Sequence, residues 1–91
     1  MAARIEVAKL KEDKFQVRVV EGKSESIHRV TLTGDDYRRL SVGRIEPEEL
    51  IRRSFEFLLA REPKESILAE FDLPLIGHYF PEYERELKRS I

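Results

Sequence analysis

The chain has 91 residues, of which 41% are hydrophobic and 38% are charged, and it contains no cysteine. A chain of this length is expected to fold as a single domain, residues 1–91, and the lack of cysteine excludes disulfide bonds and thiolate metal sites. No stretch approaches the roughly 18 to 20 apolar residues of a membrane span, and the first residues carry too much charge for a secretory signal. We therefore expect a cytoplasmic protein without a membrane segment.

Charge is spread evenly along the chain, with 17 basic and 18 acidic residues and a net charge of −1. Residues 1–33 hold 7 basic and 5 acidic residues (+2), residues 34–62 hold 6 and 7 (−1), and residues 63–91 hold 4 and 6 (−2). A dedicated nucleic-acid-binding protein concentrates basic residues to neutralise phosphates. The composition does not favour this class of partner, and nucleic-acid binding is kept only as an alternative.

Three runs in the first third of the chain alternate between apolar and polar residues, which is typical of strands with one buried face. The residues expected on the buried faces are Ile5 and Val7 in the first run, Phe15, Val17 and Val19 in the second, and His28, Val30 and Leu32 in the third. Short polar segments separate the runs. This arrangement predicts a three-stranded antiparallel meander.

The pattern changes to a helical period after Thr33. Thr33 is expected to cap a short helix, with Asp36 three residues later as in a capping box. Pro47 suits the first turn of a longer helix, predicted over residues 47–61. The apolar face of this helix spans an arc of about 200°, which is wider than one packing surface requires. We therefore expect helix 47–61 to pack on the sheet and to be covered by the C-terminal segment.

The C-terminal third is interrupted by prolines and a glycine. A helix is predicted to restart after Pro63 and to place Ile67, Leu68 and Phe71 on its apolar side. Pro74 and Gly77 limit the next residues to short turns, and a last helix is expected to open at Pro81. The predicted fold class is α+β, a three-stranded antiparallel meander followed by helices.

Residues 71–83, FDLPLIGHYFPEY, form the most apolar segment of this part of the chain. Most of its apolar surface is needed to cover the predicted long helix, so intramolecular packing is the first interpretation. Four of the eight aromatic residues also lie here, and tyrosine is enriched at protein interfaces. Part of the segment is therefore predicted to be a partner or self-association surface, with His78, Tyr79 and Tyr83 as candidate contacts. A ligand pocket is the third alternative.

No pattern of catalytic or ligand-binding residues stands out in the sequence. His28 and His78 lack further ligands at metal-binding spacing, and a packed or surface role is expected for both. No serine has a G-x-S-x-G context, and the glycines are isolated rather than grouped in a phosphate-binding loop. The prediction names no catalytic residue, no metal site and no cofactor, and an enzymatic activity is only a remote alternative.

Residues 27–60 resemble the ribbon-helix-helix DNA-binding family, because a strand, HRVTLT, is followed by a capped helix, a turn and the helix PEELIRRSFEFLLA. In that family two chains pair one strand each into a ribbon that reads the major groove. The resemblance implies Arg29, Thr31 and Thr33 as DNA contacts. The first helix is shorter than the family pattern, two additional strands precede the ribbon strand, and Glu48 opens the second helix, where the family faces a phosphate. A DNA-binding dimer is therefore the alternative function.

Residues 55–84 are similar to a small family of uncharacterised bacterial proteins that carry a REPKESIL…FDL…YFPEY signature. This resemblance implies a bacterial, cytoplasmic setting, and it brings no activity, cofactor or catalytic residue. The favoured prediction is a small non-enzymatic binding or regulatory module that acts through protein–protein contacts or self-association.

Overall fold

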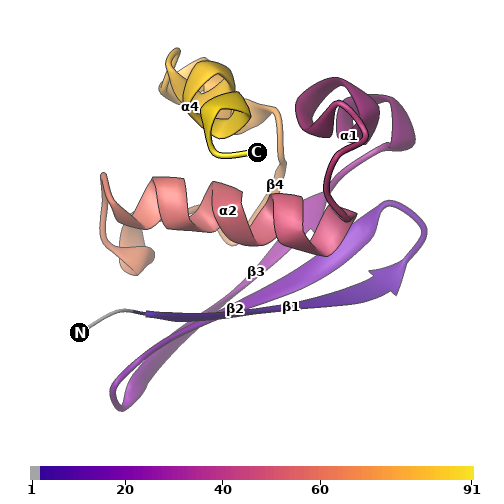
Figure 1. The fold of residues 1–91 in the computed structure, drawn as a ribbon. Coiled ribbons are helices and arrows are strands. Elements are labelled where there is room, and N and C mark those ends of the chain that lie inside the picture. Colours follow the sequence, from indigo (N-terminus) through magenta and orange to yellow (C-terminus); the bar gives the residue numbers. More distant parts are fainter. Residues whose placement is uncertain (1–2) are drawn as a thin grey trace.

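The computed structural model of the chain describes residues 3–91 and shows a four-stranded sheet with helices on one face (Figure 1). The strands are β1 (Arg4–Lys11), β2 (Lys14–Glu21), β3 (Ser24–Thr31) and β4 (Glu70–Asp72). The helices are α1 (Gly34–Ser41), α2 (Pro47–Leu59), the 3-10 helix η1 (Lys64–Ser66), α3 (Leu75–Tyr79) and α4 (Tyr83–Arg89). The α+β class is confirmed.

Strands β1, β2 and β3 form the antiparallel meander that the period-two pattern predicts. Val7 pairs with Val17, and Val17 pairs with His28, so these three residues form one row across the sheet. Asp13 and Gly22, in the two connecting turns, have positive φ angles of 64° and 61°. Glycine adopts such angles freely and aspartate tolerates them, which explains why these residue types mark the turns.

Strand β4 extends the sheet beyond β3 and runs parallel to it. The prediction that a helix restarts after Pro63 is wrong. Only the 3-10 helix η1 forms there, and the backbone is already extended at Ile67. Phe71 is buried in β4 whereas Glu70 and Asp72 are exposed, which is the alternation of a strand. Pairing with β3 satisfies backbone groups of this short segment, and an isolated helix of similar length would be only marginally stable.

The predicted starts of α1 and α2 are confirmed, whereas α4 starts at Tyr83, two residues after the predicted start at Pro81. Thr33 Oγ1 accepts a hydrogen bond from the backbone N–H of Asp36 at 3.2 Å and so caps α1. Pro47 occupies the first turn of α2, where its lack of an N–H group leaves no hydrogen bond unmade. Helix α2 ends at Leu59, two residues before the predicted end, and has 13 residues. Within residues 3–91, no helix is long and apolar enough to cross a membrane.

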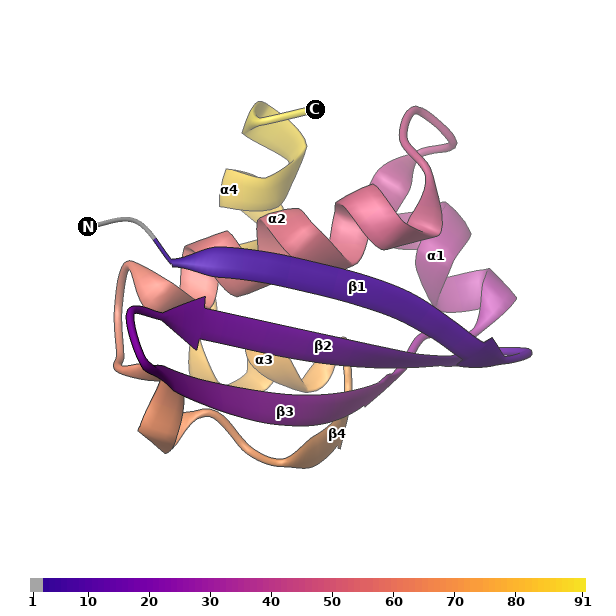
Figure 2. The ribbon, with the colours of Figure 1, turned by 90° about the horizontal axis from the view of Figure 1, so that it is seen from below.

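Helix α2 lies between the sheet on one side and helices α1 and α4 on the other, as two perpendicular views show (Figures 1 and 2). On the sheet side, the ring of Phe55 lies 5.3 Å from that of His28 and 6.0 Å from that of Phe71, measured between centroids. On the opposite side, the Ser54 hydroxyl lies 2.6 Å from the Tyr83 hydroxyl of α4. The wide apolar face of α2 therefore serves two layers, as its sequence predicts.

Candidate functional site

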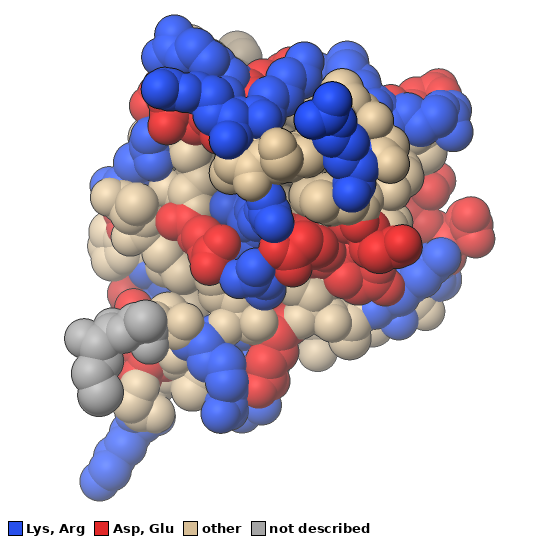
Figure 3. Space-filling model, viewed as in Figure 1, with Lys and Arg blue, Asp and Glu red and all other residues tan. Residues whose placement is uncertain are grey.

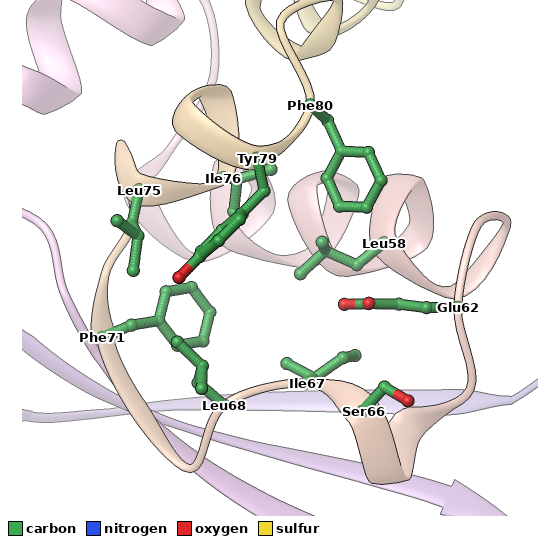
Figure 4. A pocket seen from close by; sticks show the side chains of 10 residues that line it. All are labelled: Leu58, Glu62, Ser66, Ile67, Leu68, Phe71, Leu75, Ile76, Tyr79 and Phe80. Atoms are coloured by element: carbon green, nitrogen blue, oxygen red, sulfur yellow. The ribbon is translucent and has the colours of Figure 1, made fainter.

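A concave pocket opens between the C-terminal end of α2, η1, β4 and α3 (Figure 4). It encloses about 330 Å³. The residues that line it are mostly apolar: Leu58, Glu62, Ser66, Ile67, Leu68, Phe71, Leu75, Ile76, Tyr79 and Phe80. We call this feature the β4 pocket. A largely apolar concavity with a few polar groups is the usual form of a site that takes up a small molecule or group.

The backbone surrounds this space because regular structure is broken several times between residues 59 and 80. The chain leaves α2 at Leu59, turns through η1 and becomes extended at Ile67, where φ is −77° and ψ is 133°. It then follows β4 and turns at Pro74 into α3, which has only 5 residues. Helix, strand and turn thus face one another around a volume that their side chains do not fill (Figure 4).

Two buried polar residues hold the wall of the β4 pocket in place. The Nδ1–H of His28 donates to the carbonyl of Leu68 at 2.7 Å, and the Ser26 hydroxyl lies 2.8 Å from Nε2. Lys64 in η1 forms ion pairs with Glu65 at 2.5 Å and with Glu21 of β2 at 3.1 Å. Hydrogen bonds to Glu65 and Glu21 raise the pKa of the Lys64 ammonium, so it stays charged. His28 therefore has a packed structural role, in agreement with the prediction.

The pocket has a buried floor and an exposed apolar rim. Leu58, Ile67 and Ile76 are buried at its base. Leu68 and Tyr79 belong to its lining but leave 48% and 63% of their surface exposed. Exposed large apolar side chains beside a concavity are typical of a surface that binds an apolar partner group.

One carboxylate gives the pocket its polarity. Figure 4 shows the Glu62 carboxylate directed into the pocket, across from the floor residues. The neighbouring Arg61 is engaged by Glu82 at 3.2 Å, and no ion pair among the described residues includes Glu62. A half-buried carboxylate of this kind accepts hydrogen bonds, so it suits an apolar group that carries an N–H or O–H donor.

The predicted partner-surface residues separate into two groups. His78 and Tyr79 are exposed, their ring centroids are 5.7 Å apart, and Tyr79 lies on the rim of the β4 pocket. The prediction is wrong for Tyr83, which is fully buried between α4 and α2. Burial raises the pKa of the Tyr83 hydroxyl above its ordinary value, which its hydrogen bond with Ser54 partly opposes. Tyr83 belongs to the core because the break at Pro81 turns α4 back onto α2.

Sequence reasoning did not find Glu62 and Leu68 as site residues. Leu68 was expected on the apolar side of a helix, together with Ile67 and Phe71. The signal that was available is the alternation of Glu70, Phe71, Asp72 and Leu73, which is typical of a strand rather than a helix. Glu62 carries no local signal, because its position in the pocket depends on where the chain turns after α2.

The residues implied by the ribbon-helix-helix resemblance do not form a free ribbon strand. Arg29 is exposed, but Thr31 accepts a hydrogen bond from Lys14 Nζ at 2.9 Å and Thr33 caps α1. Strand β3 pairs with β2 on one edge and with β4 on the other. The part of β3 that carries Arg29 and Thr31 is paired within the chain on both edges, so this arrangement does not support the DNA-binding alternative.

A second groove, of about 510 Å³, lies between α2 and α4 and is lined by Arg52, Arg53, Glu56, Phe57, Arg61, Glu86, Leu87 and Ser90. Its arginines are balanced by carboxylates. Arg52 lies 2.5 Å from Glu49 and 2.8 Å from Glu56, and Arg53 lies 2.8 Å from Glu49. Figure 3 shows acidic and basic side chains interleaved over α2. Hydrogen bonds from Arg52 and then Arg53 lower the pKa of Glu49 to about 2. This groove therefore offers no unbalanced positive field for an anion.

Within the described part of the chain, no group of three or more His, Cys, Asp or Glu side chains has the geometry to hold a metal ion. Comparisons of the chain with protein-family models, with curated proteins and with solved structures found no match. The inference of function therefore depends on the geometry of the β4 pocket.

Proposed function

We propose that the protein is a small non-enzymatic binding module, and that its β4 pocket holds an apolar side chain of a protein partner. The observation that supports this is the juxtaposition of a buried apolar floor with the exposed Leu68 and Tyr79 on its rim. Burying an apolar side chain there removes the apolar surface of both partners from water, which is the main driving force of most protein associations. The bacterial, cytoplasmic setting implied by the sequence signature belongs to the same proposal.

A selection from a random peptide display library, followed by affinity measurements, tests this function. We expect the selected peptides to share a large apolar residue and to bind with an affinity that fluorescence anisotropy can measure. Leu68→Glu places a second carboxylate in the lining of the pocket, across from Glu62, and should weaken binding by at least about tenfold. Leu10→Glu is the matched control, because Leu10 is 50% exposed and lies in β1, at the opposite edge of the sheet.

Circular dichroism establishes that both variants fold before their affinities are compared. Equal binding by the wild type, Leu68→Glu and Leu10→Glu would show that the peptides bind elsewhere and would overturn the proposal. A library that yields no specific binder would also overturn it.

A further inference from the structure

The outer edge of β4 is a free hydrogen-bonding edge next to the β4 pocket. Arg29 donates its backbone N–H to the Ala69 carbonyl at 2.7 Å, and Leu73 donates to the Thr31 carbonyl at 2.9 Å. The odd-numbered residues of this segment therefore bond to β3, and Glu70 and Asp72 direct their N–H and C=O groups away from it. No strand of residues 3–91 pairs with this side of β4.

The pocket lies on the face of the sheet toward which Phe71 points. Phe71 is buried, lines the pocket and contacts Phe55 of α2, so its side chain is on the helix-covered face. Side chains of a strand alternate between the two faces, and neighbouring strands are about 4.8 Å apart. A strand added beside β4 would therefore direct one side chain, next to Phe71, into the pocket, and its flanking side chains to the opposite face.

The charge around this edge favours a basic partner. Residues 62–79 contain four acidic residues and one lysine, a net of −3, and the lysine is the buried Lys64. Glu70 and Asp72 are exposed, and no ion pair in residues 3–91 includes either of them. Arg29 lies opposite Glu70 on β3 without forming such a pair. An added strand would bring its outward-facing side chains beside these two carboxylates.

The other edge of the sheet has the opposite character. Strand β1 carries Lys9 and Lys11 at its end, and its pairing with β2 shifts register between them. Lysines and irregular pairing are among the features that prevent an edge strand from pairing with another chain. Strand β4 is short, but it carries carboxylates in place of lysines and pairs with β3 without a register shift, so its charge makes it the edge better suited to a basic strand.

We propose that the partner is an extended peptide that adds a fifth strand beside β4, with an aromatic residue in the β4 pocket and lysine or arginine on either side of it. The aromatic residue is a tryptophan or tyrosine, whose N–H or O–H donates to Glu62. The outward-facing basic residues lie beside Glu70 and Asp72. Main-chain hydrogen bonds and one side-chain pocket together are the common features of peptide recognition by strand addition. This inference rests on the proposed function of the pocket.

The test uses the full chain and a short synthetic peptide in which lysines alternate with valine, tryptophan and valine. Two derivatives carry N-methyl groups on alternate residues, one on the residues whose N–H groups face β4 and one on the residues between them. We expect one derivative to bind at least about tenfold more weakly than the parent peptide and the other to bind equally well. Glu70→Gln with Asp72→Asn, both at exposed positions, should weaken binding and reduce its dependence on salt.

Amide hydrogen exchange then locates the added strand. On saturation with the peptide, exchange at the N–H groups of Glu70 and Asp72 should slow at least about tenfold. The N–H of Leu73 is already bonded to β3 and is the internal control.

Each outcome separates this inference from the proposed function. Binding that Leu68→Glu weakens, with no effect of N-methylation and no slowing at Glu70 and Asp72, would overturn strand addition and retain the pocket. Binding that Leu68→Glu leaves unchanged would overturn the proposed function as well. Failure of the lysine peptide to bind, when library peptides of another pattern do bind, would overturn the basic aromatic partner. If the wild type forms a dimer that dissociates in Leu68→Glu, the outer edge of β4 pairs with a second copy of the chain. That result would also overturn this inference.

Discussion

Tyr79 and Tyr83 lie four residues apart in the same apolar segment, yet their environments are opposite. Tyr79 is 63% exposed on the rim of the β4 pocket, whereas Tyr83 is 0% exposed between α4 and α2. In a continuous helix, residues four apart share one face. Here α3 ends at Tyr79, the backbone is extended at Phe80 (φ −127°, ψ 90°), and α4 begins at Tyr83. The break sends one tyrosine to the surface and the other to the core.

The comparison shows that intramolecular packing and an exposed partner surface each describe some of residues 71–83. Tyr83, Leu73 and Ile76 are buried and belong to intramolecular packing. Tyr79 and His78 are exposed, and their rings form a T-shaped pair with centroids 5.7 Å apart. The two residues are of the same type and lie in the same apolar segment, so the direction of the chain between them decides which one is buried.

The largest expected effect is the loss of the buried ring. Tyr83→Ala should lower the free energy of unfolding by about 3–5 kcal/mol, because it removes a buried aromatic side chain and leaves a cavity against α2. Tyr79→Ala should change it by less than about 0.5 kcal/mol, as is usual for exposed positions. Urea unfolding followed by circular dichroism measures both variants. Similar unfolding midpoints for the two variants would contradict the comparison.

The second effect concerns peptide binding, for which Tyr79 is expected to matter directly although it contributes little to stability. Tyr79→Ala should weaken binding of library-selected peptides by about tenfold or more, because it removes half of the exposed apolar rim. Val42→Ala is a matched control, since Val42 is 53% exposed and does not line the pocket. Fluorescence anisotropy measures the affinities. If the two variants bind alike, Tyr79 is not a contact of the pocket.

A smaller effect isolates the hydroxyl of Tyr83. The Ser54 hydroxyl donates to the Leu50 carbonyl at 2.8 Å, so the Tyr83 hydroxyl donates to Ser54 Oγ at 2.6 Å. Tyr83→Phe should lower the free energy of unfolding by about 1 kcal/mol and leave no unpaired buried donor. A double-mutant cycle with Ser54→Ala measures the coupling, and the losses should not add. Additive losses would mean that the two hydroxyls do not interact.

The smallest effect concerns an ion pair at the same contact between α2 and α4. Arg53 bonds both to Glu49 and to the carbonyl of Ser90, after α4. Hydrogen bonds from Arg52 and then from Arg53 lower the pKa of Glu49 from its ordinary value of 4.5 to about 2 in the folded chain. Its contribution to stability is therefore complete above pH 4.5 and is lost as the pH falls towards 2. Because the pair is partly exposed, we expect less than about 1 kcal/mol.

Acid-dependent unfolding of Glu49→Gln measures this contribution. The stability difference from the wild type should be constant near neutral pH and should shrink between pH 4.5 and 2. Glu48→Gln is the control, because Glu48 is exposed and is in no ion pair among the described residues. A difference that persists unchanged at pH 2 would show that Glu49 acts through packing rather than charge.

Much of the fold could be predicted from local patterns. Alternating apolar residues marked β1, β2 and β3, and Thr33 and Pro47 marked the starts of α1 and α2. These signals are local, because side-chain alternation, capping and the restricted φ of proline act within a few residues. Strand β4 was missed because its alternation extends over only a few residues, and pairing with a distant strand decided their conformation.

The candidate site was less predictable than the fold. Tyr79 was predicted as a partner contact because it is a tyrosine in a segment rich in aromatic residues. Tyr83 was predicted on the same surface for the same reason, but it is buried. The backbone of Leu68 is held by a hydrogen bond between its carbonyl and His28, 40 residues earlier. A contact over that distance in the chain cannot be found from a local pattern.

The sequence by itself determined the period of each element, the two-sided apolar face of α2 and the balance of charge, since these depend on residue types at short spacing. Only the tertiary structure decided which apolar residues of the C-terminal third are buried. Parallel pairing of β4 with β3 turned Phe71 inward and left an open edge beside the β4 pocket. The reason is that exposure is a property of what lies opposite a side chain, and in this segment the opposite surface comes from α2 and β3, far away in the chain.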